Sequence, residues 1–218
     1  MPPGRTLVIG DIHGCSLALK TLLEAVQPSM EDTLVTLGDY VDRGPDVAGV
    51  VELLCDLAGN CRFIPLLGNH ELMMFQAFKG MQTGFWMECG GRETLASYGG
   101  KLSNIPAHHL AFFENCLQYH ETEKEFFVHA NYDYDLPLNE QHEEVMFWQH
   151  VNRQIPPAHI SGKRAFVGHT PQMDGEIKYF EHIVLMDTFC FGGMWLSALD
   201  VHSGKCWQAN NFGDLRSD

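Results

Sequence analysis

The sequence predicts an α/β fold in which short buried strands alternate with helices. Five short apolar runs each stop abruptly at a polar loop, most of them at a glycine; these are residues 6–10, 34–38, 63–68, 126–128 and 165–168. Their length, their β-branched or aromatic content and the flanking glycines are typical of buried strands. Between the first three runs, Leu and Val recur at helical spacing, and the order strand, helix, strand indicates parallel strands joined by helices.

The predicted elements follow in order along the chain. Helical patterns cover about residues 17–26 and 47–57, and residues 72–118 read as a helical excursion, rich in Met and Phe and broken by glycines, over one end of the sheet. Within the excursion, Met73 to Phe75 and Phe78 are expected in the core or else in a substrate wall. Phe85 and Trp86 are expected to pack structurally or else to line a groove. Between residues 176 and 210, three apolar runs predict antiparallel strands that close a second sheet: Ile183–Met186, Trp195–Val201 and Lys205–Gln208.

Length and composition predict one domain over residues 1–218, because no repeat, linker or low-complexity tract divides the 218-residue chain. No apolar stretch reaches the roughly 18–20 residues of a membrane span, and the first residues turn polar too early for a signal peptide. We therefore expect a cytoplasmic protein without a membrane partner. The seven cysteines include no C-x-x-C pair, which favours reduced, packed thiols over disulfides.

The charge balance excludes a protein that binds nucleic acid through a basic surface. The chain has 14 Lys and Arg against 28 Asp and Glu, so that 14 − 28 = −14. Any phosphate chemistry must therefore bring its own local positive charge. The 12 histidines suggest metal or proton chemistry.

Polar residues follow the five apolar runs and, if the strand ends meet, converge on one crevice. They are Asp11, His13, Asp39, Asn69, His129 and His169. Carboxylates, an amide oxygen and imidazoles together suit Mn, Fe or Zn better than Ca. Since one carboxylate of Asp39 can bridge two ions, the set predicts two divalent metal ions per chain, with Mn expected first and Fe or Zn as alternatives. His108 and His109 are expected to be surface or packing residues.

Three further residues near these ligands suit phosphoester hydrolysis. Arg43 can fork onto phosphate oxygens. His70, next to Asn69 in the chain, is placed to protonate a leaving group, and Asp42 could orient that imidazole and keep it protonated.

The motifs that carry these residues resemble the signatures of one family. They are G-D-I-H-G at 10–14, G-D-Y-V-D-R-G at 38–44, G-N-H-E at 68–71, His-Ala at 129–130 and G-H-T at 168–170. In this order they are similar to the five signatures of the calcineurin-like metallophosphoesterases, and within them of the phosphoprotein-phosphatase branch. That branch includes serine/threonine protein phosphatases of the bacteriophage lambda type and symmetrical diadenosine tetraphosphatases. The resemblance spans about residues 6–200 and implies a two-sheet β-sandwich flanked by helices.

The resemblance also implies roles for single residues. Asp11, His13 and Asp39 would bind one metal, while Asp39, Asn69, His129 and His169 would bind the second. Arg43 would bind phosphate with Asn69, and His70 with Asp42 would form the general acid. Bacterial members usually carry a second phosphate-binding Arg after a Trp; here Trp148 precedes Gln149 and His150, so either His150 or Arg153 is expected in that role.

The predicted function is therefore dimetal-dependent phosphomonoester hydrolysis. The expected reaction is in-line attack of a hydroxide that bridges the metals, with His70 as general acid. The expected enzyme is a serine/threonine or dual-specificity protein phosphatase acting on a phosphorylated protein or small phosphoester. A symmetrical dinucleoside tetraphosphatase is the alternative; its substrate calls for more cations than Lys79, Arg92 and Lys101, the three that the excursion offers. A non-catalytic scaffold is a minor alternative, since such proteins typically lose site residues that are all present here.

Overall fold

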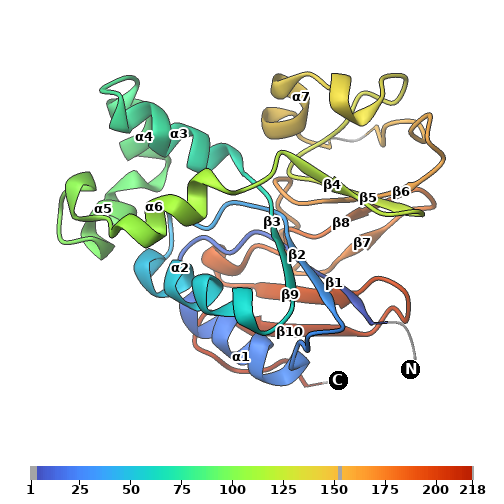
Figure 1. The fold of residues 1–218 in the computed structure, drawn as a ribbon, viewed down its shortest axis with the longest axis horizontal. Helices are drawn as coiled ribbons and strands as arrows, with labels where there is room; N and C mark the ends of the chain where they lie inside the picture. The colour runs from blue at the N-terminus through green and yellow to red at the C-terminus, as the bar shows by residue number, and fades with distance from the viewer. Residues whose placement is uncertain (1–3, 152–153, 218) are drawn as a thin grey trace.

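Two five-stranded sheets lie face to face between helices in the computed structural model, which describes residues 4–151 and 154–217 (Figure 1). The strands of the first sheet, in spatial order, are β10 (Cys206–Asn210), β9 (Trp195–Asp200), β1 (Thr6–Ile9), β2 (Thr33–Thr36) and β3 (Arg62–Pro65). The strands of the second sheet are β4 (Tyr119–Glu121), β5 (Glu125–Val128), β6 (Arg164–Val167), β8 (Ile183–Leu185) and β7 (Lys178–Tyr179).

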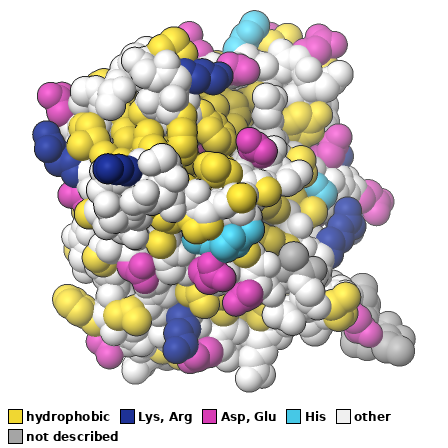
Figure 2. Space-filling model, turned by 60° about the vertical axis from the view of Figure 1, so that its left-hand side comes forward, with side chains coloured by type: hydrophobic (Ala, Val, Ile, Leu, Met, Phe, Trp, Pro, Cys, Tyr) yellow, Lys and Arg dark blue, Asp and Glu magenta, His cyan; other side chains and the backbone are white. Residues whose placement is uncertain are grey.

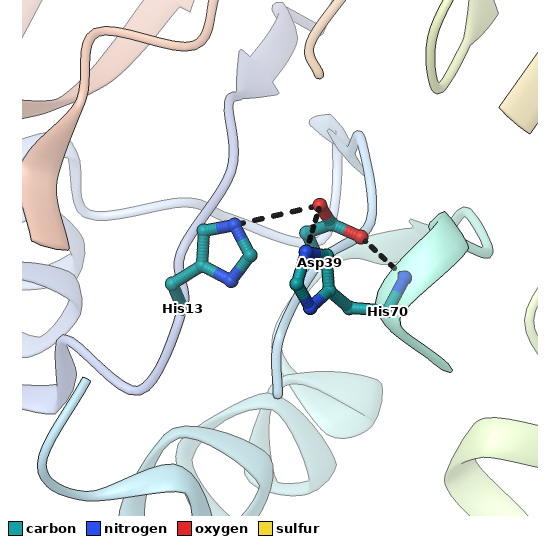
Figure 3. Close-up of side chains that lie close together, drawn as sticks. All are labelled: His13, Asp39 and His70. Carbon is teal, nitrogen blue, oxygen red and sulfur yellow. Dashed lines mark hydrogen bonds and ion pairs between the residues drawn. The ribbon is translucent and has the colours of Figure 1, made fainter. Parts of the chain in front are cut away.

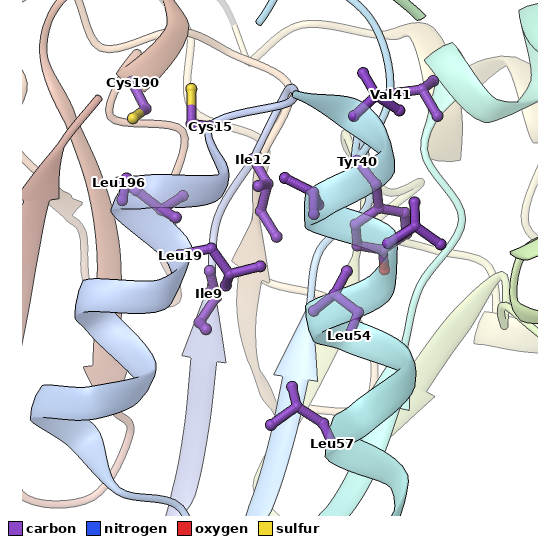
Figure 4. Packing of buried hydrophobic residues seen from close by; sticks show 14 of the residues in the cluster. Ile9, Ile12, Cys15, Leu19, Tyr40, Val41, Leu54, Leu57, Cys190 and Leu196 are labelled. Carbon is purple, nitrogen blue, oxygen red and sulfur yellow. The ribbon is translucent and has the colours of Figure 1, made fainter. Parts of the chain in front are cut away.

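The first sheet is built from two βαβ units. β1, β2 and β3 are parallel, joined by α1 (Ser16–Val26) and α2 (Val47–Asp56). Both helices turn an apolar stripe toward the sheet, where Leu19, Leu54 and Ile9 belong to one buried cluster (Figure 4).

The core between the sheets explains why the strand runs are apolar without interruption. Val8 of β1 and Phe166 of β6 point into this inter-sheet layer, whereas their chain neighbours Leu7 and Val167 point to the outer layers. In the second sheet the outer layer is completed by α7 (Glu143–Trp148), which buries Met146 and Phe147 against the strands. Because both faces of these central strands are covered, every residue of β5 and β8 is buried, as are three of the four residues of β1, β2 and β6.

A helical insertion connects the two sheets and covers the end of the first one (Figure 1). It contains α3 (Asn69–Phe78), α4 (Thr83–Trp86), a wide turn at Met87–Gly91, α5 (Arg92–Ser97) and α6 (Ala107–Glu114). Figure 2 views the molecule from this side, where hydrophobic side chains gather on the surface. A groove there is lined by Leu72, Phe75, Phe78, Leu110 and Phe113 among others.

The structure confirms the α/β sandwich, the five strands and the helical excursion, and it corrects the C-terminal region. The three runs after residue 176 do form strands, but they do not build the second sheet together. β9 pairs antiparallel with β1 and β10 antiparallel with β9, so both extend the first sheet, while β8 joins the second sheet parallel to β6. Met73 and Met74 are buried as expected, and Phe75 is partly buried against the same cluster. The prediction of a core position is wrong for Phe78, which is 38% exposed at the groove. Among the described residues, no helix is long and apolar enough to cross a membrane.

We expect Phe166→Ala to lower the free energy of unfolding by about 3–5 kcal/mol, because it empties the layer between the sheets, where the ring stacks on Phe127 with centroids 5.3 Å apart. Urea unfolding followed by circular dichroism measures the change. Phe212→Ala is the control, since that side chain is 82% exposed and should change stability by less than about 0.5 kcal/mol. Equal effects of the two substitutions would contradict the assigned core.

Candidate metal centre and active site

Five of the six polar residues that follow the strands line one pocket of about 190 Å³. The first sheet contributes Asp11 and His13 after β1 and Asp39 after β2, and the second contributes His169 after β6. His129, which follows β5, is fully buried just behind the pocket. The remaining lining includes Asn69 and His70 from the start of α3, with Arg43, Met73, Phe85, Cys89, Trp148, His150, Pro171 and Asp187.

The backbone at these strand ends is unusual. His13, Asp39, Asp42, Arg43 and His169 all have positive φ, between 44° and 69°, and they are five of the eight non-glycine residues with positive φ in the described part of the chain. This left-handed conformation costs free energy for residues other than glycine and persists where the surroundings determine it. The loops are therefore held in shape by contacts around the site.

Asp39 lies at the centre of the site. His13 Nε2 lies 3.4 Å from its Oδ2, and the backbone N–H of His70 donates to Oδ1 at 3.0 Å (Figure 3). His129 Nε2 lies 3.5 Å from the same Oδ1. Burial alone would raise the pKa of Asp39, but the imidazoles of His129, His70 and His13 outweigh it and hold this pKa below its usual value. Asp39 therefore stays ionised, with each oxygen directed toward a different imidazole.

His13 is oriented as metal-binding histidines are. Its Nδ1–H donates to the carbonyl oxygen of Val41 at 2.8 Å. Burial, followed by the nearby His70, lowers the pKa of His13 well below its ordinary value, so the ring is neutral. Nε2 then carries a lone pair, and it faces an oxygen of Asp39 rather than a donor.

His129 and His169 repeat this arrangement around Asn69. His129 Nδ1 donates to the carbonyl oxygen of Leu37 (2.7 Å) and His169 Nε2 to that of Trp148 (3.1 Å). Their other ring nitrogens lie 2.9 and 3.0 Å from Oδ1 of Asn69. Burial lowers the pKa of His129, and burial together with His129 lowers the pKa of His169 to about 3. Two neutral imidazoles thus direct lone pairs at one amide oxygen.

This donor set fits divalent cations. Three imidazoles are anchored by backbone carbonyls through one nitrogen, while the other nitrogen faces an acceptor; a cation between them converts each repulsion into coordination. Asp11, which accepts from the backbone N–H of His169, adds a carboxylate whose pKa is raised by burial and by the charges of Asp187 and Asp39. Two ligand groups share Asp39: it lies with His13 and His70 in one and with His129 and His169 in the other.

Another His-rich group lies outside this pocket and has no such repulsion. Glu52 of α2 accepts from Nε2 of His108 and of His109 at 3.1 and 2.8 Å. The hydroxyl of Tyr98 lies 2.8 Å from Nδ1 of His109 and can donate to it. In each of these three contacts a hydrogen-bond donor faces an acceptor. Hydrogen bonding alone therefore accounts for the group.

Glu71 holds the loop that carries Asp39. This fully buried carboxylate accepts from the backbone N–H groups of Asp39, Tyr40 and Val41 and from that of Gly68, at 2.8–3.1 Å. Gly68 is required there, because a Cβ atom would lie 2.2 Å from Oδ1 of Asp39. One side chain of α3 thus ties the end of β2 to the start of that helix.

His70 and Asp42 form the pair that the sequence predicts. Nδ1 of His70 lies 2.7 Å from Oδ2 of Asp42, and Nε2 lies on the pocket side, 4.0 Å from Oδ2 of Asp39. Burial lowers the pKa of His70, but the charges of Asp39 and Asp42 outweigh it and leave this pKa raised. The raised pKa favours the protonated imidazole, which is the form that can give a proton to a bound group.

Two of the residues predicted to bind phosphate, Arg43 and His150, lie at the same pocket. The guanidinium of Arg43 lies over the ring of Phe191, with Cζ 4.5 Å from its centroid, and Phe191 also packs edge-on against His13. His150 lines the pocket and stacks on His169, with ring centroids 4.3 Å apart. Arg153, the other predicted second phosphate contact, lies outside the described residues.

Asp187 was missed by the sequence reasoning. It is buried, lines the pocket and follows β8, so the rule that found Asp39, a polar residue directly after an apolar run, would have found it as well. Burial, with the charge of Asp39, raises its pKa to about 7.

The two expectations for Phe85 and Trp86 hold for one residue each. Trp86 packs structurally, because it is buried and its indole N–H donates to Asp42. Phe85 lines the pocket, where it is 52% exposed.

Comparison with known proteins agrees with this arrangement. The profile of calcineurin-like phosphoesterases matches residues 4–192. The chain belongs to this family. Proteins of the family depend on two metal ions, and the structure contains two groups of His and Asp side chains, joined through Asp39, that could hold metal ions.

Curated relatives carry two different names. Serine/threonine-protein phosphatase 1 of Salmonella typhimurium is 40% identical over 85 residues, which is 38% of each chain. A symmetrical bis(5'-nucleosyl)-tetraphosphatase of Pectobacterium atrosepticum is 40% identical over 77 residues, 35% of this chain and 27% of the relative. The matches thus span 38% and 27% of the length of these two relatives.

Solved structures show the same fold over nearly the whole chain. A crystal structure with the provisional name diadenosine tetraphosphatase has a TM-score of 0.73 at 24% identity, covering 95% of this chain and 94% of its own. A cold-active protein-tyrosine phosphatase of a Shewanella species has a TM-score of 0.70 at 15% identity, covering 99% and 82%.

Glu71→Gln should destabilise the protein by about 2 kcal/mol or more, because an amide NH₂ replaces one oxygen and faces two backbone N–H groups that then lack an acceptor. Thermal unfolding measures the loss, and Mn binding by calorimetry should weaken as the loop of Asp39 shifts. Glu24→Gln, on the exposed face of α1, is the matched control. A Glu71→Gln protein as stable as this control would refute the tethering role.

Proposed function

We propose that this protein is a dimetal-dependent phosphomonoesterase, and that its substrate is a phosphorylated serine or threonine of a protein, with phosphotyrosine as a further possibility of the same site. The observation that carries the proposal is the convergence of a complete ligand set, the His70–Asp42 pair and Arg43 on one pocket of about 190 Å³. That volume suits a phosphoryl group with a small part of its leaving group.

The metal ligands are assigned as the family resemblance implies. Asp11, His13 and Asp39 hold the first ion; Asp39, Asn69, His129 and His169 hold the second. Mn suits this mixture of oxygen and imidazole donors, with Fe or Zn as alternatives. When bound, the two ions supply positive charge for phosphoryl oxygens and acidify an attacking water.

The remaining residues bind the substrate and move a proton. Arg43 offers its guanidinium fork to phosphate oxygens, and its stacking on Phe191 limits where that fork can lie. The side chains of Asn69 and His150 face the same space and complete the phosphate contacts. His70, held through Nδ1 by Asp42, donates the proton on Nε2 to the departing alkoxide or phenoxide.

The charge around the pocket favours a phosphomonoester over a dinucleoside tetraphosphate. Among the described residues that line it, Arg43 is the one Lys or Arg, and Lys79, Arg92 and Lys101 of the insertion are not among them. A substrate with about four negative charges calls for more. The second candidate, a symmetrical dinucleoside tetraphosphatase, is favoured by a different observation: Phe85 and Trp148 are 52% and 37% exposed at the pocket, where bases could stack.

The substrate class is tested by measuring kcat/KM on a phosphoserine peptide, a phosphotyrosine peptide and diadenosine tetraphosphate, at fixed Mn concentration after the protein has been treated with a chelator. We expect activity to return with Mn and the phosphoserine peptide to be the best substrate, because one guanidinium and two ions match one phosphate. A hundredfold preference for the dinucleotide would reverse the ranking. No turnover of any substrate with Mn would favour a scaffold.

His70→Asn should lower kcat on the phosphoserine peptide by roughly 10²–10⁴-fold, since the alkoxide then leaves without a proton. Metal content, measured by mass spectrometry of the dialysed protein, should stay at two ions per chain, because the predicted ligands are intact. His142→Asn, an exposed position before α7, is the control and should leave kcat unchanged. Unchanged turnover by His70→Asn would remove it from the mechanism.

A further inference from the structure

The helical insertion supplies two donors to the carboxylate of Asp42. The hydroxyl of Thr94, on α5, donates to Oδ1 at 2.6 Å. The indole N–H of Trp86, at the end of α4, lies 3.0 Å from both carboxylate oxygens. Together with His70 at 2.7 Å from Oδ2, three side chains from three helices converge on one carboxylate.

These contacts leave the carboxylate little freedom. Asp42 and Thr94 are 0% exposed and Trp86 is 1% exposed, so water does not compete for the oxygens. Thr94 and Trp86 occupy Oδ1, and Trp86 also borders Oδ2, which leaves Oδ2 for His70. A carboxylate rotated about its Cβ–Cγ bond would lose at least one of these bonds in a buried site, where an unpaired donor is costly.

The insertion also holds the backbone of the same loop. Asp42 and Arg43 have φ values of 69° and 67°, and the N–H of Asp42 donates to Oγ1 of Thr94 at 2.8 Å. The N–H of Arg43 lies 3.3 Å from the carbonyl oxygen of Gly90. At Gly91, a Cβ atom would lie 2.5 Å from the indole of Trp86, so only glycine lets the turn close over that ring.

We propose that Trp86 and Thr94 are positioning residues that hold Asp42 in the orientation from which it accepts the Nδ1–H of His70 and directs Nε2 at the leaving group. The inference rests on the hydrolysis proposed above and adds what prepares its general acid. The proton passes from Nε2 to the departing oxygen, and the neutral imidazole is reprotonated from water in the next cycle. Neither residue lines the pocket, so both act through Asp42.

Leaving-group dependence separates this role from a purely structural one. Phenyl phosphate needs a proton on its poor leaving group, whereas 2,4-dinitrophenyl phosphate does not. We expect Thr94→Val and Trp86→Phe to lower kcat on phenyl phosphate about tenfold or more and to change kcat on the dinitrophenyl ester by less than about threefold. Thr94→Ser, which keeps the hydroxyl, should restore the phenyl phosphate rate.

Ser97→Ala is the matched control, because Ser97 lies on the same helix and accepts from the backbone N–H of Ala48 without touching Asp42. It should change neither rate. An equal loss on both esters in Thr94→Val, or rates like those of the control, would overturn the proposal.

A second measurement does not depend on turnover. In the zinc-loaded protein, the proton between His70 Nδ1 and Asp42 should give a downfield NMR resonance that is absent in His70→Asn. We expect Thr94→Val and Trp86→Phe to shift or broaden it and Thr94→Ser and Ser97→Ala to leave it in place; an unmoved resonance in Thr94→Val overturns the positioning role. If the parent protein hydrolyses neither ester, the proposed function fails, and the resonance alone decides whether the two residues position Asp42.

Discussion

The site depends on the contacts of the buried Asp39 carboxylate with the imidazoles around it. Its oxygens face His13, from the end of β1, and His129, from the end of β5, so one side chain joins ligands of both sheets. The imidazoles around it carry lone pairs on the nitrogens that face oxygen, because their other nitrogens donate to backbone carbonyls. Lone pairs that face oxygen atoms repel them unless a cation lies between the two. The geometry therefore favours metal binding at this site.

The same arrangement reconciles phosphate chemistry with a chain of net charge −14. A broad basic surface is not needed where the positive charge is concentrated in a small pocket. Arg43 and the proton on His70 are the protein's own contributions to that charge, and both are held by neighbours: Arg43 by the ring of Phe191 and His70 by Asp42. In the function that we propose, phosphate binding is therefore local and depends on metal.

The helical insertion contacts the loop after β2 directly, although it lies far from that loop in the sequence. It separates the two sheets in the chain, yet Glu71, Trp86 and Thr94 reach back to the loop that follows β2. Asp39, Asp42 and Arg43 on this loop have left-handed backbone conformations, and hydrogen bonds from the insertion stabilise them. The insertion is therefore part of the apparatus that shapes the site.

The amino-acid pattern alone predicts the α/β class, the five strands and the residues that meet at their ends. Buried strands are continuous apolar runs in the sequence, and the polar residues directly after them can be identified. Tertiary structure alone decided that β9 and β10 extend the first sheet, since short apolar runs do not reveal their partners. It also decided that Thr94 reaches Asp42 across 52 residues, a contact for which neither residue type nor spacing gives a signal. Local pattern reports burial and periodicity, whereas pairing between distant segments follows from how the whole core packs.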